Sequence, residues 1–160
     1  MVIYRVLGAI TVMTSSIWFY FIIEGYEKKK TIQINAYLKL LSYIKAQIEC
    51  YMLPIDMVLM KCDGSLIYDC GFYEDERPKS FNELLDNSKF YIDNEMLEKL
   101  CAFSRELGTS YAEDQLKLCE RYISDLNIMY EKYKTQRTKD KKLSLAICLS
   151  TSLSLILILI

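Results

Sequence analysis

The sequence predicts an all-α protein, a small helical bundle between two terminal transmembrane helices. Both ends of the 160-residue chain are uncharged and apolar, at residues 6–23 and 143–160. Between them, apolar residues recur at steps of three and four, the spacing of one helix face. Helix start and stop signals separate these stretches. We therefore expect an N-terminal transmembrane helix at residues 1–23, a cytoplasmic helical-bundle domain at 24–142 and a C-terminal transmembrane helix at 143–160.

Each apolar end is about 18 residues long, so as a helix it covers roughly 27 Å and nearly crosses a hydrocarbon core of about 30 Å. Trp18, Phe19 and Tyr20 supply amphipathic rings near the inner end of the first segment. A cleaved signal peptide is the alternative there, but the apolar run is long and no small-x-small site precedes Glu24. A buried core helix is the alternative for the second segment, although its LILILI sequence has no polar face.

The basic residues that flank the two segments predict the orientation. Only Arg5 lies with the amino terminus outside the first segment. The inner flanks carry Lys28, Lys29, Lys30, Arg137, Lys139, Lys141 and Lys142. The positive-inside rule therefore places the central domain in the cytoplasm and both termini on the far side. The same basic side chains can bind anionic lipid headgroups.

The first soluble helix is expected to run on from the membrane segment, beginning near Glu27. Proline disfavours a helical residue before it, so this helix ends before Pro54, and Pro54 begins a short second helix. The apolar stripe consists of Ile34, Tyr37, Leu41, Ile44, Ile48 and Tyr51. Such a stripe predicts either an intramolecular core, which we favour, or a coiled coil between chains.

The middle of the chain contains breaks and short elements. Asp63-Gly64-Ser65 ends the second helix. Residues 66–73 fit a short helix or a strand, and we favour the helix because its neighbours are helical. Residues 74–79 form a loop. Ser80-Phe81-Asn82-Glu83 reads as a capping box that opens a short helix to about Asn87.

Two further helices complete the prediction. Asp93 or Asn94 caps the first, Gly108 closes it, and its stripe consists of Met96, Leu100, Phe103 and Leu107. A second capping box, Ser110 to Glu113, opens the last helix. No strong breaker interrupts that helix before Ile160, a length of about 70 Å. Its stripe consists of Leu116, Cys119, Ile123, Leu126, Tyr130 and Tyr133.

Composition argues against several function classes. The 20 basic and 21 acidic residues give no general case for nucleic-acid binding. The sequence has no histidine, no C-x-x-C pair and only scattered glycines, so nothing predicts a nucleophile-base pair, a metal, a phosphate-binding loop or another cofactor. We therefore expect a non-enzymatic protein. The six cysteines are expected to be small buried thiols in a reducing compartment.

The acidic residues are unevenly spread. Residues 63–98 carry ten acidic and three basic side chains, including the run Glu74, Asp75 and Glu76. A second acidic pair is Glu113 with Asp114. Such runs are usually solvated faces, and the alternative is a docking surface for a basic partner.

One stretch carries a family resemblance. Residues 106–144, followed by a terminal apolar segment, resemble the stage III sporulation protein AB family of endospore-forming bacteria. The family typically has a leucine-glycine pair, a serine, and an acidic residue with glutamine, which here are Leu107, Gly108, Ser110, Asp114 and Gln115. A weaker match lies at Gln47-Ile48 and residues 53–55, where the family's glutamate and threonine are missing.

The resemblance implies a function that the residues alone do not. The family is similar to half of the inner-membrane platform protein of type II secretion and type IV pilus systems. It implies a place in the outer forespore membrane, in the feeding-tube channel between mother cell and forespore, with the central domain on the mother-cell side. The implied partners are a hexameric stage III AA ATPase and other stage III A membrane proteins, and homo-oligomers are possible. The motif residues and Glu74–Glu76 are the candidate interaction residues.

Two alternatives stay open. A self-assembling membrane scaffold without an ATPase partner would use the same helices. A membrane-tethered sensor or enzyme would need a pocket with convergent polar groups, which nothing in the sequence predicts.

Overall fold

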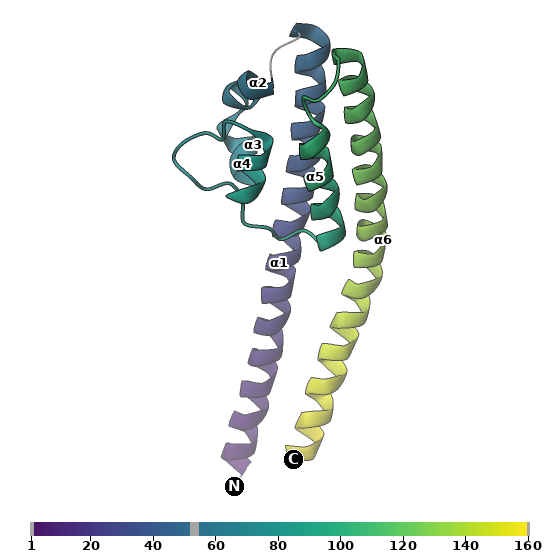
Figure 1. The fold of residues 1–160 in the computed structure, drawn as a ribbon. Coiled ribbons are helices and arrows are strands. Elements are labelled where there is room, and N and C mark those ends of the chain that lie inside the picture. Colours follow the sequence, from purple (N-terminus) through teal and green to yellow (C-terminus); the bar gives the residue numbers. More distant parts are fainter. Residues whose placement is uncertain (1, 52–54, 160) are drawn as a thin grey trace. The chain divides into compact units, whose positions relative to one another are not determined.

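The computed structural model describes the backbone of residues 2–51 and 55–159, and every side chain from 17 to 50 and from 57 to 143. Over these residues the protein is all-α, as predicted (Figure 1). Phe72 and Ser88 also form an isolated antiparallel β-bridge. The helices are α1 (Val2–Tyr51), α2 (Ile55–Lys61), α3 (Gly64–Asp69), α4 (Phe81–Asp86), α5 (Asn94–Glu106) and α6 (Ala112–Leu159).

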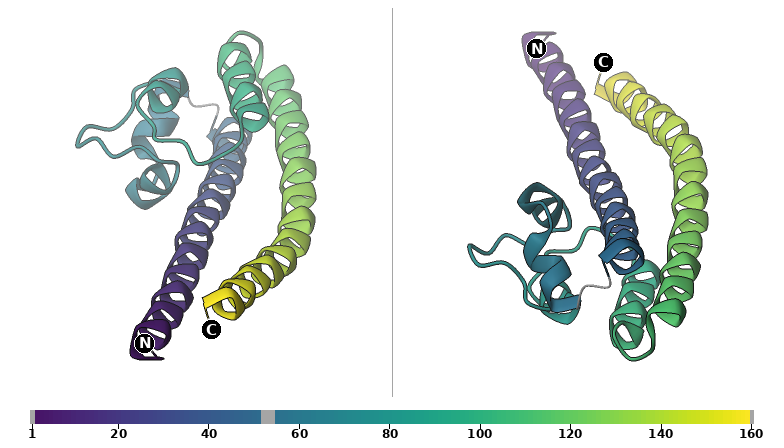
Figure 2. Two further views of the ribbon diagram at one scale, coloured as in Figure 1. Left: turned by 90° about the horizontal axis from the view of Figure 1, so that it is seen from below. Right: turned by 90° about the horizontal axis from the view of Figure 1, so that it is seen from above.

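The chain divides into two compact units. One combines residues 1–28 with 132–160, and we call it the terminal helix pair. The other is residues 29–131, which we call the central unit. Figures 1 and 2 show the two helical segments of the terminal pair, the beginning of α1 and the end of α6, side by side and antiparallel.

Charged side chains join the two helices of the terminal pair where their uncharged stretches begin. The Glu24 carboxylate accepts hydrogen bonds from Arg137 and from Lys141, each at 3.1 Å. One turn away, the Tyr133 hydroxyl donates to the Glu27 carboxylate. These contacts fix the register of α1 against α6 in this unit.

Among the described residues, no helix combines the length and the apolar character needed to cross a bilayer.

Many side chains of the two predicted membrane segments, including that of Cys148, lie outside the described residues.

The core of the central unit forms around α1. The predicted stripe is confirmed as an intramolecular core, because five of its members are at most 5% exposed: Ile34, Tyr37, Leu41, Ile44 and Ile48. Each such side chain contributes about 1.5–3 kcal/mol when fully buried. The sixth side chain, Tyr51, and the predicted break at Pro54 lie outside the described residues.

The mixed segment 66–73 is helical at its beginning and extended at its end. Asp63 caps α3 by accepting a hydrogen bond from the Ser65 amide at 3.0 Å. The helix stops at Asp69, and Gly71 then takes a φ of +101°, a left-handed value that suits glycine. The chain turns there into the bridge at Phe72, so both readings of this segment are partly correct.

The next two helices begin as predicted. The Ser80 hydroxyl accepts from the Glu83 amide at 3.1 Å, while the Glu83 carboxylate reaches one residue farther back, to the Lys79 amide at 2.6 Å. Asp93 precedes α5, but its carboxylate makes no bond to that helix. It accepts instead from the Lys30 ammonium, with both oxygens at 2.7 Å. This pair ties the start of α5 to α1.

A buried amide holds the loop between α4 and α5. The Gln33 side chain is 1% exposed on α1. Its Nε2 donates to the carbonyl oxygens of Cys70, at 2.7 Å, and Lys89, at 2.8 Å. Its Oε1 accepts from the Tyr91 amide at 2.7 Å. One side chain therefore satisfies three backbone groups from two segments, the end of α3 and the loop before α5.

The buried face of α6 differs from the predicted stripe. Cys119 and Leu126 are buried as expected, whereas Leu116, Ile123 and Tyr130 are only half-buried. The other buried positions are Gln115 and Tyr122, each one residue before a predicted member. The face is rotated because both of these side chains reach hydrogen-bond partners on or near α5.

The cysteine prediction is confirmed in part. All five described cysteines are free thiols, and Cys62, Cys70 and Cys119 are buried. Burial raises the pKa of Cys119 to about 11, so this thiol stays neutral and unreactive at physiological pH. Cys50 is exposed.

Candidate functional site

The turn between α5 and α6 contains the residues of the family resemblance. Leu107 ends α5, its amide bonding to the Phe103 carbonyl at 2.9 Å. Gly108 follows with a φ of +83°, the left-handed value that lets the chain reverse. The first bond of α6 runs from the Gln115 amide to the Tyr111 carbonyl at 2.9 Å. Tyr111 is thus the cap residue.

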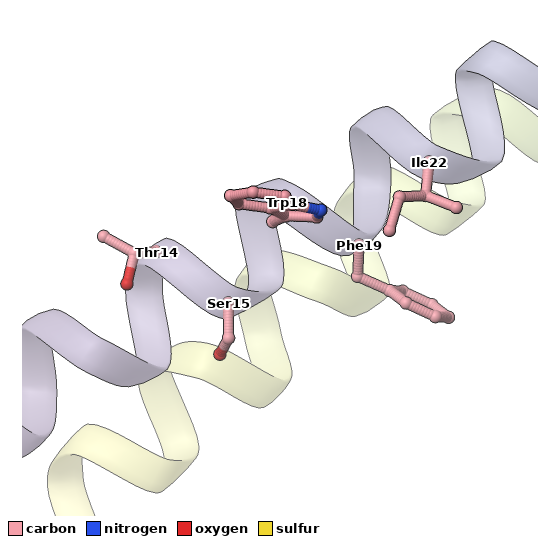
Figure 3. A pocket seen from close by; sticks show the side chains of 5 residues that line it. All are labelled: Thr14, Ser15, Trp18, Phe19 and Ile22. Carbon is pink, nitrogen blue, oxygen red and sulfur yellow. The ribbon is translucent and has the colours of Figure 1, made fainter.

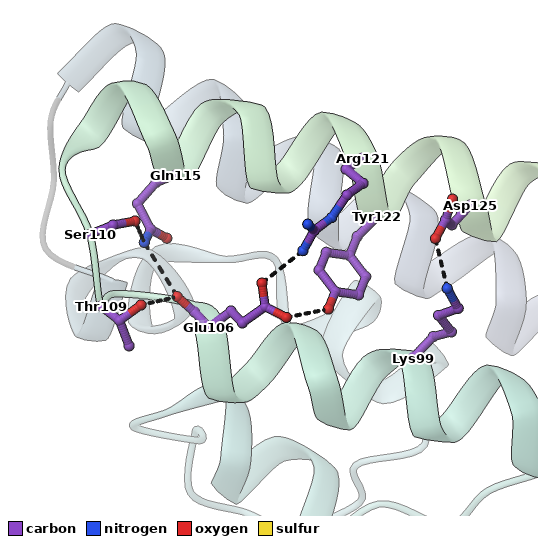
Figure 4. A network of polar contacts seen from close by, with 8 residues as sticks. All are labelled: Lys99, Glu106, Thr109, Ser110, Gln115, Arg121, Tyr122 and Asp125. Atoms are coloured by element: carbon purple, nitrogen blue, oxygen red, sulfur yellow. Dashed lines mark hydrogen bonds and ion pairs between the residues drawn. The ribbon is translucent and has the colours of Figure 1, made fainter.

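The capping box predicted at Ser110 is wrong, because Ser110 lies one residue before the cap residue Tyr111. The Ser110 hydroxyl accepts from Gln115 Nε2 at 2.8 Å (Figure 4). The Gln115 side chain is 3% exposed, and its Oε1 accepts from the Gly108 amide at 3.0 Å. Nε2 also lies 3.4 Å from the Glu106 carbonyl. Gln115 therefore clamps the turn from inside.

Gln115→Leu should lower the free energy of unfolding by about 1–2 kcal/mol, because it removes the hydrogen bonds that the buried Gln115 side chain makes to the Gly108 amide and to Ser110. Equilibrium denaturation of the full chain in detergent, followed by circular dichroism, measures the change. Asp114→Asn is the control, since Asp114 is exposed and adjacent, and it should change little. Equal effects of the two substitutions would contradict the clamp.

A polar network joins α5 to α6 beyond the turn. The Glu106 carboxylate accepts from the Tyr122 hydroxyl and from the Arg121 guanidinium, both at 2.7 Å (Figure 4). The Tyr122 bond and then Arg121 lower the pKa of the Glu106 carboxyl. Farther along, Lys99 pairs with Asp125 at 2.8 Å. These contacts fix how α6 lies against α5.

The structure separates the motif residues by role. Gly108, Ser110 and Gln115 meet in the clamp, and Leu107 is half-buried beside it. Asp114 points to solvent and is the motif residue left available for a partner. Most of the motif therefore builds the turn from which α6 starts.

The acidic run lies in a different part of the central unit, in the loop between α3 and α4. Glu74, Asp75 and Glu76 are all exposed. Within the described residues, none of the three forms an ion pair. Their negative charge is therefore uncompensated by close partners and available to a basic surface.

A single arginine holds the acidic loop against α2. Arg77 Nη1 donates to the carbonyl oxygens of Met60, at 2.5 Å, and Cys62, at 2.8 Å. The Met57 and Met60 side chains are 45% and 54% exposed on this helix. We call Met57, Met60 and Glu74–Glu76 the acidic surface. It combines flexible apolar side chains with unpaired carboxylates, a composition suited to protein recognition.

A shallow pocket lies on α1. Thr14, Ser15, Trp18, Phe19 and Ile22 line it (Figure 3). Its lining is apolar apart from two hydroxyls and contains no titratable group. Among the described residues, no group of three or more histidine, cysteine or carboxylate side chains is arranged to hold a metal ion.

Several residues that position these sites were not predicted. Gln33 lies next to the apolar stripe, and nothing local marks its partners 37 to 58 residues away. Glu106 is the first residue of the stretch that resembles the family, and the resemblance is the signal that could have identified it. Glu24 stands at the inner edge of the first apolar segment, where a carboxylate needs a basic partner.

The comparison with known families covers the part of the chain that contains the turn and the acidic run. No curated protein and no solved structure matches the chain. The family model of stage III sporulation protein AB matches residues 73–160, which include the acidic run, the Gln115 clamp and all of α6. Since this match covers more than half of the sequence, the chain belongs to the stage III sporulation protein AB family.

Proposed function

We propose that this sporulation protein is a non-enzymatic membrane platform that presents its central unit to a hexameric secretion-type ATPase in the mother-cell cytoplasm. The observation that carries the proposal is the continuity of the two long helices. Each runs unbroken from an uncharged apolar end into the packed central unit, α1 over Val2–Tyr51 and α6 over Ala112–Leu159. A force on the central unit could reach both ends without crossing a flexible linker.

Membrane anchoring is supported by the sequence of the two ends and by the charges at their inner edge. Residues 6–23 and 143–160 contain no charged side chain. Glu24, the first charge after the first segment, is paired with Arg137 and Lys141. Pairing lowers the penalty of holding a carboxylate beside hydrocarbon. The excess of basic flanks favours a cytoplasmic central unit. The outer forespore membrane is the location that the family resemblance implies.

The acidic surface is the proposed docking site for the ATPase. Its three carboxylates attract a basic patch over a distance of about 10 Å at moderate salt. Met57 and Met60 supply the apolar contact that gives such an encounter its lifetime. The Gln115 clamp and the network at Glu106 hold α5 against the beginning of α6 within the central unit.

Reversal of the acidic run tests the docking site. Glu74→Lys, Asp75→Lys and Glu76→Lys together should lower the amount of ATPase copurified from sporulating cells by about tenfold, because each replaces attraction by repulsion. All three positions are exposed, so the fold should persist.

The matched control changes the same number of charges elsewhere. Glu49→Lys, Glu95→Lys and Glu98→Lys alter exposed positions on α1 and α5. This variant should copurify the ATPase as the unaltered chain does. Equal retention of ATPase by both variants would overturn the docking site, and equal loss would show that only net charge matters.

A further inference from the structure

Three tyrosines gather at one edge of the central unit. The rings of Tyr68, on α3, and Tyr73, just after it, meet edge to face with centroids 4.7 Å apart. Their side chains are 60% and 50% exposed. The bridge between Phe72 and Ser88 and the hydrogen bond from the Lys89 amide to the Gly71 carbonyl bring the segment that carries Tyr91 alongside the segment that carries Tyr73. Three neighbouring amphipathic rings form a contiguous aromatic patch, and an exposed patch of this kind often marks an interaction site.

Two lysines complete this cluster. The ammonium of Lys29 lies 5.4 Å from the centroid of the Tyr91 ring, and that of Lys89 lies 5.9 Å from it. Among the described residues, neither forms an ion pair with a carboxylate. We call Lys29, Tyr68, Tyr73, Lys89 and Tyr91 the tyrosine patch.

The backbone beneath the patch is fixed. The Tyr91 amide donates to Gln33, and the Lys89 amide donates to the Gly71 carbonyl at 2.9 Å. The bridge between Phe72 and Ser88 holds the strand that leads to Tyr73. The rings and ammonium groups are therefore presented from a braced surface, which reduces the entropy lost when a partner binds.

The position of Lys29 along α1 indicates what this surface meets. Lys29 lies six residues beyond Ile23, the last residue of the uncharged segment, in the same helix. At about 1.5 Å per residue this is roughly 9 Å along the helix axis. The headgroup layer on each side of a bilayer is about 5–8 Å deep. If residues 6–23 span the membrane, as in the proposed function on which this step rests, the Lys29 backbone lies just beyond the headgroup layer, and its long side chain, which lies over the Tyr91 ring, is within reach of the headgroups.

We propose that the tyrosine patch lies on the cytoplasmic surface of an anionic bilayer. The phenol rings enter the interface, where tyrosine is favoured because its ring is apolar and its hydroxyl remains hydrated. Lys29 and Lys89 bind anionic headgroups. Asp69 and Glu74, the carboxylates next to Tyr68 and Tyr73 in sequence, mark the limit of the contact because anionic headgroups repel them. The central unit is then held by this contact as well as by its two helices.

Fluorescence quenching in reconstituted full-length chain tests the contact. The protein has one tryptophan, so Trp18→Phe gives a background free of other signals. Tyr73→Trp on this background reports the patch, and Tyr68→Trp is a second reporter in case the first disturbs the fold. Tyr111→Trp is the matched control, because Tyr111 is 87% exposed in the turn before α6. The bilayers contain lipid with a spin label near the headgroup, with or without phosphatidylglycerol.

The patch reporters should be quenched strongly in anionic bilayers, and the control should not. Adding Lys29→Gln and Lys89→Gln should reduce the quenching to the level found in zwitterionic bilayers. A patch reporter quenched no more than the Tyr111→Trp control would overturn the contact, and quenching that ignores both lysines would overturn its anionic character.

Alkaline carbonate extraction of the unaltered chain separates this inference from the proposed function. A chain that stays in the membrane while its patch reporters are unquenched is anchored but makes no such contact, so only the inference fails. A chain released by carbonate is not anchored, and both then fail.

Discussion

Gly71→Ala is expected to lower the free energy of unfolding by about 3 kcal/mol or more. Gly71 has a φ of +101°, which an alanine adopts only with strain. The new Cβ would also stand 2.4 Å from the Lys89 carbonyl oxygen and 2.5 Å from Gln33 Nε2. Neither atom can withdraw easily, because the two are hydrogen-bonded to each other.

Gly64→Ala is the matched control for this prediction. Gly64 is the first residue of α3, and the nearest atom to its added Cβ is Arg77 Nη2 at 4.0 Å. Alanine should be neutral or slightly stabilising there, because it restricts the unfolded chain. Denaturation of both variants by guanidinium, followed by circular dichroism, gives the comparison. Similar midpoints for the two would show that the segment around Gly71 yields to the added methyl group.

Gln33→Leu should lower the free energy of unfolding by about 4 kcal/mol. Leucine is of similar size, so the loss comes from hydrogen bonding and not from a change in volume. The substitution leaves three backbone groups without partners: the carbonyl oxygens of Cys70 and Lys89 and the amide of Tyr91. A buried group left unsatisfied costs about 1–3 kcal/mol, and some of these would recover water.

The same helix provides a control for the glutamine. Gln47 is partly exposed on α1, so Gln47→Leu should change stability by less than about 0.5 kcal/mol. Hydrogen exchange adds a local reading: the Tyr91 amide should exchange much faster in Gln33→Leu than in the unaltered chain. Retained protection of that amide would contradict the role assigned to Gln33.

The elements with local signals were predictable from the sequence. The stripe on α1 could be recognised because one helix face repeats every three to four residues, and its members are buried. The starts of α4 and α5 were predictable because Ser80 and Asp93 are residues that prefer the cap position. Gly108 marked the end of α5 for a similar reason, since few other residues accept its φ.

The contacts between distant segments were not predictable in the same way. A glutamine beside an apolar stripe reads as a solvent-facing residue until its partners at Cys70, Lys89 and Tyr91 are known. The prediction of which face of α6 is buried was wrong for a related reason. Several apolar residues on that helix allow two overlapping stripes, and Gln115 and Tyr122 decide between them through partners on or near α5.

The candidate site was predicted as residues but not as an arrangement. The family resemblance pointed to the turn, yet Gly108, Ser110 and Gln115 could not be recognised as one clamp, because a hydrogen bond between side chains leaves no periodic pattern. The acidic run was found directly, since charge is visible in sequence. Its attachment to α2 through Arg77 was not, and that contact joins the acidic loop to the helix that carries the two exposed methionines.

Site-specific photocrosslinking in sporulating cells tests the platform most directly. A photoreactive amino acid at Asp75 probes the acidic surface, and the same group at Glu98, an exposed position on α5, serves as the control. Mass spectrometry of the adducts identifies what each position touches. The account predicts an adduct between Asp75 and a subunit of a hexameric ATPase, absent at Glu98. Adducts at Asp75 only with further copies of this chain would contradict it and would favour a self-assembling scaffold.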